Sequence, residues 1–239
     1  MRVLVLRPEP AAARTAERLR AFGHEAALLP LSRAEHAVDA VKAGLAEPHA
    51  AIAITSAEVA RLFEKIGDAL APHLPTNLFA VGQASADAAR KVGFQTVFTA
   101  AGDGKGLADL IAAHYRDLLQ DPILYLAGNP RTPGFEAGLR EEAIPFRTVE
   151  SYRMVPLAPS PAEIDAALLQ PVPDAVLLYS RESARAFFSL SPLAQTPGRL
   201  HAMRILCMSP NVAAAVPPDF AARTAIAPAP DEESLLALL

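Results

Sequence analysis

The chain has 239 residues, 51% of them hydrophobic and 20% charged, with a formal net charge of −4. This globular composition suffices for one large domain or two smaller ones, and the negative balance gives no general attraction to nucleic acid or to an anionic membrane surface. The single cysteine, Cys207, excludes an internal disulfide framework and fits a reducing compartment.

No apolar run approaches the roughly 18 residues of a membrane span, and the apolar stretch at the start of the chain is too short for a signal peptide. We therefore expect a cytoplasmic protein that binds no membrane and no nucleic acid. Residues 2–6 predict a strand, residues 10–22 a helix and residues 26–29 a second strand. Residues 31–35 lose this periodicity and predict a connection between domains.

The middle of the chain predicts alternating strands and helices. A helix at 37–45 leads into an apolar run at 52–54, which is followed by a helical pattern. Further strands are predicted at 78–81, 95–98, 123–126 and 145–150, with helices at 84–92, 107–119 and 135–142. Five strands therefore lie between residues 50 and 150.

The last part of the chain predicts only three strands, at 175–179, 204–208 and 223–226, with helices at 162–169, after Ser180, after Pro210 and at 232–238. Three strands make a poor doubly wound sheet, whereas the two strands before Pro30 raise the number to five. We therefore expect a discontinuous α/β domain of residues 1–33 and 156–239 and an inserted α/β domain of residues 37–150. The connectors would lie near 33–37 and 150–156, where the second is rich in proline.

Residues 52–63 recur as residues 176–187, each copy an apolar run, a serine and a helical pattern. The matching pairs are Ser56/Ser180, Glu58/Glu182, Ala60/Ala184, Arg61/Arg185 and Phe63/Phe187. Each serine is expected at a helix N-cap. This internal repeat favours two similar doubly wound, flavodoxin-like parallel-sheet domains, although any two strand-to-helix turns share part of the pattern.

Several standard sites are not supported by the sequence. Residues 102–106 are glycine-rich but do not match a P-loop or a dinucleotide motif, so they predict a loop. The six histidines stand singly and there is one cysteine, so no metal site is expected. Ser56 and Ser180 lack the context of a nucleophile elbow, which gives nucleophilic catalysis little support.

Polar groups follow the predicted strands, where parallel sheets bind ligands. They are Arg7, Thr55-Ser56, Gly82-Gln83, Gly128-Asn129, Ser180-Arg181 and Ser209-Pro210-Asn211. Together they offer N–H groups, hydroxyls and guanidinium groups to a ligand with several carboxylates or phosphates. For each residue singly, helix capping is the alternative explanation, and their collective placement is the informative observation.

Six short motifs, spread over nearly all of the chain, match one known family in order and spacing. They are Leu6-Arg7-Pro8, residues 54–59, residues 80–86, Gly128-Asn129 with Arg131, Val149-Glu150-Ser151-Tyr152-Arg153, and Ala227-Pro228. By these motifs the chain resembles uroporphyrinogen-III synthases, which close the linear tetrapyrrole hydroxymethylbilane into a macrocycle and invert its last ring.

The resemblance implies two α/β domains joined by a two-stranded connector, with an open cleft that closes on the substrate. It implies no metal and no organic cofactor. The substrate carries eight carboxylates, for which helix N-termini and the arginines 7, 131, 153, 181 and 185 are candidate binders. We expect the protein to act as a monomer.

The resemblance also assigns roles to residues. Tyr152 matches the family's V-Y tyrosine and is the expected catalytic hydrogen-bond donor, with packing of its ring as the alternative. Ser85 stands in place of a motif threonine, and Val212 stands where the second copy of that motif often has a hydroxyl. The expected substrate-binding residues are Arg7, Thr55, Ser56, Gly82, Ser85, Gly128, Asn129, Arg131, Ser180, Arg181, Ser209 and Asn211.

A non-catalytic binding protein is the competing interpretation. Two α/β domains around a cleft also describe solute-binding and sensor proteins, although no export signal supports a periplasmic one. A paralogue that binds a tetrapyrrole without converting it also fits the sequence, and the departure at Asn211-Val212 favours it.

Overall fold

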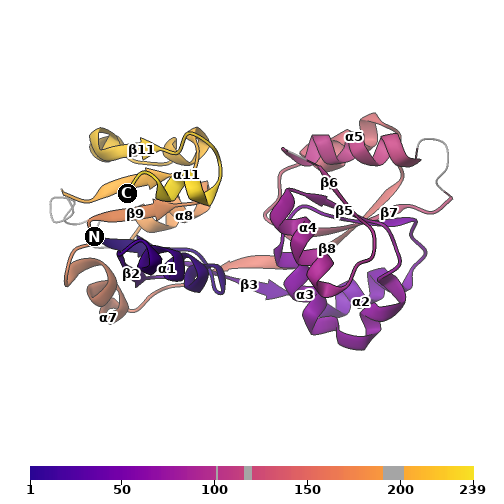
Figure 1. Cartoon of the computed structure of the whole chain (residues 1–239), viewed down its shortest axis with the longest axis horizontal. Coiled ribbons are helices and arrows are strands. Elements are labelled where there is room, and N and C mark those ends of the chain that lie inside the picture. The colour runs from indigo at the N-terminus through magenta and orange to yellow at the C-terminus, as the bar shows by residue number, and fades with distance from the viewer. Residues whose placement is uncertain (101, 116–119, 191–201) are drawn as a thin grey trace. The chain divides into compact units, whose positions relative to one another are not determined.

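The computed structural model describes residues 1–239 except 101, 116–119 and 191–201 (Figure 1). The described residues form two compact units. Unit 1 consists of Met1–Arg33 and Val155–Leu239, and unit 2 of Ala34–Met154. Each unit has its own sheet with helices on both faces.

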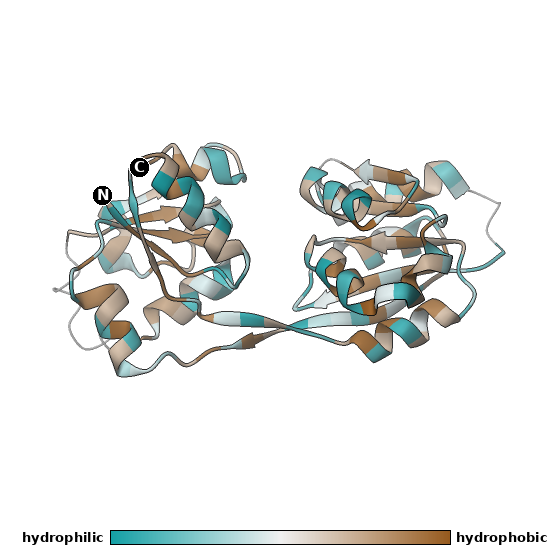
Figure 2. Ribbon diagram, turned by 60° about the horizontal axis from the view of Figure 1, so that its bottom comes forward, coloured by the Kyte–Doolittle hydropathy of each residue, from teal (hydrophilic) through white to brown (hydrophobic). Residues whose placement is uncertain are grey.

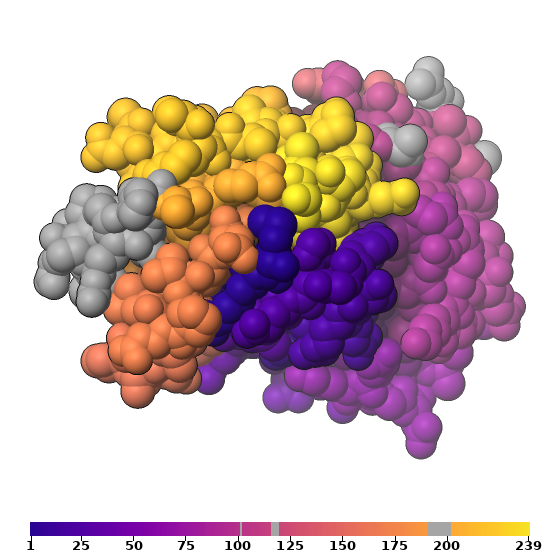
Figure 3. Space-filling view, turned by 60° about the vertical axis from the view of Figure 1, so that its left-hand side comes forward, coloured from indigo at the N-terminus to yellow at the C-terminus, as the bar shows by residue number. Residues whose placement is uncertain are grey.

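Unit 1 is built on five parallel strands in the order β2-β1-β9-β10-β11. β1 lies between β2 and β9, with Val3 opposite Ala26 on one side and Ala175 on the other. The start of the chain therefore shares a sheet with its last strands, and in Figure 3 the indigo residues lie against orange and yellow ones. The strands are β1 (Arg2–Val5), β2 (Glu25–Leu28), β9 (Ala175–Leu178), β10 (Arg204–Cys207) and β11 (Thr224–Ile226).

Helices cover both faces of this sheet. Successive strand side chains point to opposite faces, so Val3 and Val5 belong to one buried cluster and Leu4 and Leu6 to another. The face of the sheet that carries the Val3 and Val5 side chains packs against α1 (Ala11–Ala21) and α11 (Glu232–Leu236). The other face packs against η2 (Asp165–Leu169), which continues α7 (Pro161–Ile164), and against α8 (Arg181–Phe188), α10 (Pro210–Ala213) and η4 (Pro218–Arg223).

Unit 2 has six strands in the order β3-β8-β7-β4-β5-β6. The five strands from β8 to β6 are parallel to one another. β3 runs antiparallel to β8, because the Ala37 N–H donates to the Ser151 carbonyl while the Leu157 N–H donates to the Leu31 carbonyl. The strands are β3 (Ser32–His36), β4 (Ala51–Ile54), β5 (Leu78–Val81), β6 (Val97–Ala100), β7 (Ile123–Asn129) and β8 (Phe146–Pro156).

β4 is fully buried, β5 and β7 are buried except for their last residues, and in Figure 2 such strands carry the hydrophobic colour. Ile52 and Ile54 face one helical layer, and Ala51 and Ala53 face the other. The first layer comprises α2 (Val38–Ala46), α3 (Glu58–Ile66), η1 (Gly67–His73) and α4 (Gln83–Val92), and the second comprises α5 (Gly104–Tyr115) and α6 (Gly134–Glu141).

The predicted mixed α/β class with parallel sheets is confirmed. The two repeated segments form β4 with α3 and β9 with α8, and each of these strands is interior to its sheet. If the five strands of unit 1 are numbered 1 to 5 along the chain, their order across the sheet is 2-1-3-4-5. The five parallel strands of unit 2 have the same order when β7, β8, β4, β5 and β6 are numbered 1 to 5. The carboxyl ends of parallel strands share one edge of each sheet, where the sequence places the polar residues.

The expected connectors near 33–37 and 150–156 contain parts of strands β3 and β8, which pair with each other. The residue pattern of 31–35 has no apolar signal for a strand, and β3 is held by its pairing with β8. Two local predictions were wrong. β7 continues through Gly128-Asn129, which were expected after it. The glycine-rich residues 104–106 begin helix α5, because the Asp103 carboxylate accepts from the N–H groups of Lys105 and Gly106 at 3.0 and 3.2 Å.

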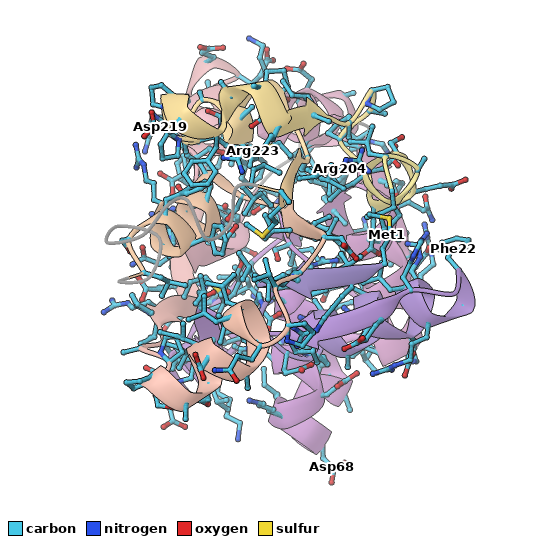
Figure 4. The ribbon with its side chains drawn as sticks, turned by 90° about the vertical axis from the view of Figure 1, so that its left-hand side faces the viewer. Met1, Phe22, Asp68, Arg204, Asp219 and Arg223 are labelled. Carbon is cyan, nitrogen blue, oxygen red and sulfur yellow. The ribbon has the colours of Figure 1, made fainter. Side chains whose placement is uncertain are left out.

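The C-terminus is tied to the sheet of unit 1. Arg204, at the start of β10, donates to the carbonyl oxygens of Leu238 at 2.6 Å and Leu239 at 3.3 Å, and it is labelled in Figure 4. Within the part of the chain that the structure describes, no helix has the length and apolar character needed to cross a membrane.

Candidate functional site

A pocket of about 280 Å³ lies at the carboxyl ends of β4, β5 and β7 in unit 2. It brings together five of the predicted site residues, namely Thr55, Ser56, Gly128, Arg131 and Tyr152. The other lining residues are Val81, Asp103, Gly104, Tyr125, Pro130, Thr132 and Phe135. This is the edge of the sheet at which doubly wound folds bind ligands.

Tyr152 is held in the pocket by Gly128 and Ser56. β7 and β8 pair Gly128 with Tyr152 at a register shift, and a Cβ atom on Gly128 would lie 2.4 Å from both Cζ and Oη of the tyrosine. Only glycine therefore leaves room for the ring. Ser151 fixes the neighbouring backbone, because its buried hydroxyl donates to the Ala127 carbonyl at 2.8 Å.

The Tyr152 phenol stays protonated at neutral pH. Burial raises its pKa and the Glu58 charge adds to this, whereas the hydrogen bond with Ser56 and the Arg61 charge act in the opposite direction. A protonated phenol at the edge of a pocket is a hydrogen-bond donor rather than a base.

Tyr125 is a second phenol of the same pocket, which the sequence analysis did not identify. Its side chain is buried, and its hydroxyl lies 3.0 Å from Oγ1 of Thr55. Burial raises the Tyr125 pKa, so this group is also neutral and protonated. Thr55 therefore has a partner within unit 2 and is fixed in place by it.

Ala57 directly precedes α3 and already has helical backbone angles. The Ser56 hydroxyl accepts from the Glu58 N–H at 3.1 Å, which is the hydrogen bond that an N-cap side chain makes. Ser56 therefore serves the start of α3 in the way that was expected of it.

Arg131 and Asn129 each have a carboxylate partner. Arg131 forms an ion pair with Glu136 at 3.1 Å, and Glu136 also accepts from Thr148. Asn129 does not line the pocket and donates to Glu150 at 2.8 Å. This hydrogen bond, together with Arg153, holds the pKa of Glu150 below its usual value.

Gly82 and Ser85 also lie outside the lining of the pocket. Gly82 is the N-cap of α4 with φ 72°, a backbone conformation that favours glycine. Ser85 is buried within α4. Their assignment to substrate binding remains a prediction.

In unit 1, Arg7 belongs to a hydrogen-bonded cluster around Glu232. Its Nη1 donates to Glu232 at 2.8 Å and to Thr15 at 3.2 Å, and its guanidinium lies 4.1 Å from the centre of the Tyr179 ring. Glu232 also accepts from Thr15 at 2.6 Å, Arg18 at 2.7 Å and Tyr179 at 2.8 Å. Arg7 thus already binds a carboxylate of its own unit.

The remaining predicted residues follow β9 and β10 in unit 1. Ser180 is the N-cap of α8 as expected, and it forms a capping box with Ser183. Arg181 and Asn211 are exposed, and Ser209 is the N-cap of α10 without a side-chain capping bond. Val212, at the position of the missing hydroxyl, packs in the core.

Sequence reasoning missed two kinds of residue. Tyr125 lies inside an apolar strand and Phe135 inside a helical pattern, so both look like ordinary core residues. Thr132 follows the Gly128-Asn129-Arg131 motif, and that motif was the signal that could have identified it. Within the described ranges, no three His, Cys, Asp or Glu side chains gather as a metal-binding group.

Chemically, the pocket offers neutral hydroxyl groups, one guanidinium and one carboxylate, that of Asp103, which accepts from N–H groups at the start of α5. The hydroxyls come from Thr55, Ser56, Tyr125, Thr132 and Tyr152, and the guanidinium from Arg131. Such a set can bind carboxylates and can donate a hydrogen bond to a departing oxygen.

Two solved structures have the same fold. The first is a uroporphyrinogen-III synthetase from Helicobacter pylori 26695, with 16% identity and a TM-score of 0.65, over 100% of this chain and 98% of that one. The second is a mutant uroporphyrinogen III synthase from the extremely thermophilic bacterium Thermus thermophilus, with 21% identity and a TM-score of 0.54, over 90% of this chain and 87% of that one. No curated protein matches the chain by sequence.

The sequence gives independent evidence of the family to which the chain belongs. The family model described as Uroporphyrinogen-III synthase HemD matches residues 13–237, which is nearly the whole chain and includes both units. The chain therefore belongs to the uroporphyrinogen-III synthase family.

Proposed function

We propose that this protein is a uroporphyrinogen-III synthase, a cyclising lyase that converts hydroxymethylbilane into uroporphyrinogen III with inversion of ring D and without a cofactor. The observation that carries the proposal is a protonated phenol, Tyr152, in a pocket at the strand ends that also contains other hydroxyls, the Arg131 guanidinium and the Asp103 carboxylate. Family membership supports the same assignment.

The proposed reaction begins with loss of the substrate's hydroxymethyl oxygen. The adjacent pyrrole nitrogen supplies the electron pair that breaks the carbon–oxygen bond, and the departing hydroxide leaves as water. The resulting azafulvene cation is attacked by the substituted carbon of the terminal ring, which gives a spiro intermediate. The original bond between the spiro carbon and its methylene bridge then breaks. The unsubstituted carbon of the same ring attacks that methylene carbon and loses its proton, which balances the proton taken up by the hydroxide and leaves the ring inverted.

The protein's contribution is hydrogen bonding and geometry. Tyr152 donates to the departing oxygen, which stabilises the negative charge that develops there. Positioning of the chain favours inverted closure over direct closure, because correct orientation lowers the barrier of the productive step alone. Carboxylates of the substrate are bound by hydroxyls, backbone N–H groups and arginines such as Arg131.

We also propose that units 1 and 2 are flavodoxin-like domains, the second inserted in the first. The shared strand order supports this proposal. We propose further that the active protein is a cytoplasmic monomer whose partner is the linear tetrapyrrole with eight carboxylates.

The test is isomer analysis of the product formed from hydroxymethylbilane by the purified protein. We expect mainly the type III isomer, whereas buffer alone gives the type I isomer. The type I isomer alone would contradict the proposal and would leave a tetrapyrrole-binding paralogue without catalysis. The Tyr152→Phe variant should keep its fold and lose about 10²-fold in turnover; unchanged turnover would remove Tyr152 from the mechanism.

A further inference from the structure

Arg131 is the only cation among the described residues that line the pocket of unit 2. Nε of its guanidinium donates to Oε1 of Glu136 at 3.1 Å, and Nη2 lies 3.1 Å from the same oxygen. These two nitrogens form one side of the planar group, so Glu136 contacts that side. The end of the guanidinium, formed by Nη1 and the second N–H of Nη2, can donate to a different carboxylate.

Glu136 is itself fixed by a strand and by its own helix. Its Oε1 also accepts from the Thr148 hydroxyl of β8 at 3.1 Å, and its Oε2 lies 3.5 Å from Nη2 of Arg140, one turn later in α6. The Glu136 side chain is 16% exposed, whereas that of Arg131 is 34% exposed. The carboxylate is therefore packed against the unit, and the guanidinium that it holds reaches the pocket.

The stability of α6 alone does not account for this carboxylate. A glutamate in the first turn of a helix is favoured by the helix dipole, but an exposed side chain would give that benefit. Glu136 is instead largely withdrawn from water, which is costly unless partners compensate the charge. The partner with two contacts to it is Arg131, the guanidinium of the pocket.

An arginine that is already held binds an anion more tightly than a free one. A free arginine side chain samples many rotamers, and their loss on binding weakens the affinity. Contact with Glu136 restricts these rotamers before a ligand arrives. The negative charge of Glu136 acts in the opposite direction, because it partly neutralises the guanidinium, but water at the partly exposed Arg131 screens that charge.

We propose that Glu136 is a positioning residue, which holds Arg131 so that the end of its guanidinium binds a carboxylate of the substrate. The inference rests on the proposed function, because that function supplies a substrate with eight carboxylates. Positioning and neutralisation predict opposite results when Glu136 is removed. Loss of positioning weakens binding of a polycarboxylate, whereas loss of neutralisation strengthens it.

The experiment measures how tightly the full-length protein binds uroporphyrin III, a fluorescent tetrapyrrole with eight carboxylates. Glu136→Ala should weaken binding about fivefold, because Arg131 is no longer held. Arg131→Ala should weaken binding about tenfold, because a charge-assisted hydrogen bond is lost. The double variant should bind no more weakly than Arg131→Ala, because Glu136 acts only through the guanidinium. Glu64→Ala, which removes an exposed glutamate of α3 and the same charge, is the matched control and should leave binding unchanged.

Glu136→Gln separates position from charge. The amide keeps an acceptor oxygen for Arg131 and removes the negative charge, so binding should stay within about twofold of wild type. In the isomer assay, Glu136→Ala should raise KM about fivefold with little change in kcat, because Arg131 contributes to binding. If Glu136→Ala does not fold, Thr148→Val removes a donor to the same carboxylate. That variant should weaken binding about twofold in the wild-type background and not at all in Arg131→Ala.

Three results of the binding measurement would overturn the inference. They are tighter binding in Glu136→Ala, a double variant in which the two losses simply add, and a wild-type protein that does not bind uroporphyrin III. None of these measurements needs turnover. A wild-type protein that binds the probe and shows the expected cycle, yet forms no type III isomer, would contradict the proposed function and leave Glu136 as a positioning residue for tetrapyrrole binding.

Discussion

At the scale of single residues, Gly128 is the clearest case of a residue whose role depends on a neighbour. The family motif suggested contact between its backbone and the substrate. The structure adds a steric role, because the Tyr152 ring occupies the space that a side chain at position 128 would fill. The position of the phenol thus depends on the absence of an atom on the adjacent strand.

Gly128→Ala should displace the Tyr152 ring. We expect a loss of about 1–3 kcal/mol in the free energy of unfolding from overpacking, together with a loss of turnover comparable to that of Tyr152→Phe. Urea denaturation and isomer analysis would measure the two effects. Gly134→Ala is the control, since a Cβ atom there meets nothing within 4 Å. Full activity in Gly128→Ala would show that the ring position is unimportant.

The two phenols of the pocket differ in how readily the sequence identifies them. Tyr152 stands in a recognisable motif, whereas Tyr125 interrupts an apolar run of β7 in which an aromatic residue is unremarkable as core. Its proximity to Thr55 depends on the pairing of β4 with β7, in which Ala53 lies opposite Tyr125. Local pattern carries no information on that pairing.

At the scale of elements, α11 is joined to the strand ends of unit 1 by one carboxylate. Glu232, the first residue of the helix, accepts hydrogen bonds from Arg7 after β1, from Tyr179 after β9 and from Thr15 and Arg18 of α1. Burial raises the pKa of Glu232, but these hydrogen bonds and the Arg7 charge outweigh it and hold the pKa below the usual value. Burial and the same carboxylate raise the pKa of Tyr179.

Glu232→Gln should destabilise unit 1 in a pH-dependent way. A carboxylate with a lowered pKa in the folded state contributes stability above its ordinary pKa of 4.5, and this stability is lost as the pH falls through the folded-state value. We expect a loss of about 1–3 kcal/mol at neutral pH.

The measurement is urea denaturation of wild type and variant across a range of pH. The difference in the free energy of unfolding should be largest near neutral pH and should shrink in acid. Glu233→Gln, exposed on the same helix, is the matched control and should differ little from wild type. A difference between Glu232→Gln and wild type that is independent of pH would contradict the assignment.

The sequence predicted the bounds of helices and strands that have a strong hydrophobic period. It did not predict those of elements that depend on hydrogen bonds or packing with a distant segment. β5 has the predicted bounds because its apolar run is bounded by Asn77 and by Gly82. β3 has no apolar face and is a strand only because β8 offers it hydrogen bonds. α5 begins within a glycine-rich segment, where Gly104 is needed because a Cβ atom would lie 2.8 Å from the backbone of Phe135.

At the scale of the whole molecule, each unit has its own hydrophobic clusters. The buried clusters of unit 1 contain residues of β1, β9 and β10, and those of unit 2 contain residues of β4, β5 and β7. No buried cluster among the described residues combines the two units. Separate cores are what independent folding requires.

Residues 34–154 should therefore fold as an isolated fragment. Circular dichroism should show a mixed α/β spectrum, and urea should unfold the fragment in one cooperative transition. Unit 1 can be tested by joining residue 33 to residue 155 with a short glycine-serine linker, because the nearby Leu157 N–H lies 2.9 Å from the Leu31 carbonyl. A fragment 34–154 without cooperative unfolding would refute the independence of unit 2.

The sequence by itself determined the mixed α/β class and the family. Apolar runs that alternate with helical periods specify strands and helices locally, and the family motifs are contiguous. Which side chains meet was decided only by the tertiary structure. Thr55 meets Tyr125 and Arg7 meets Glu232 across long stretches of chain. Such contacts depend on strand order and on how helices pack against the sheet, which no short segment encodes.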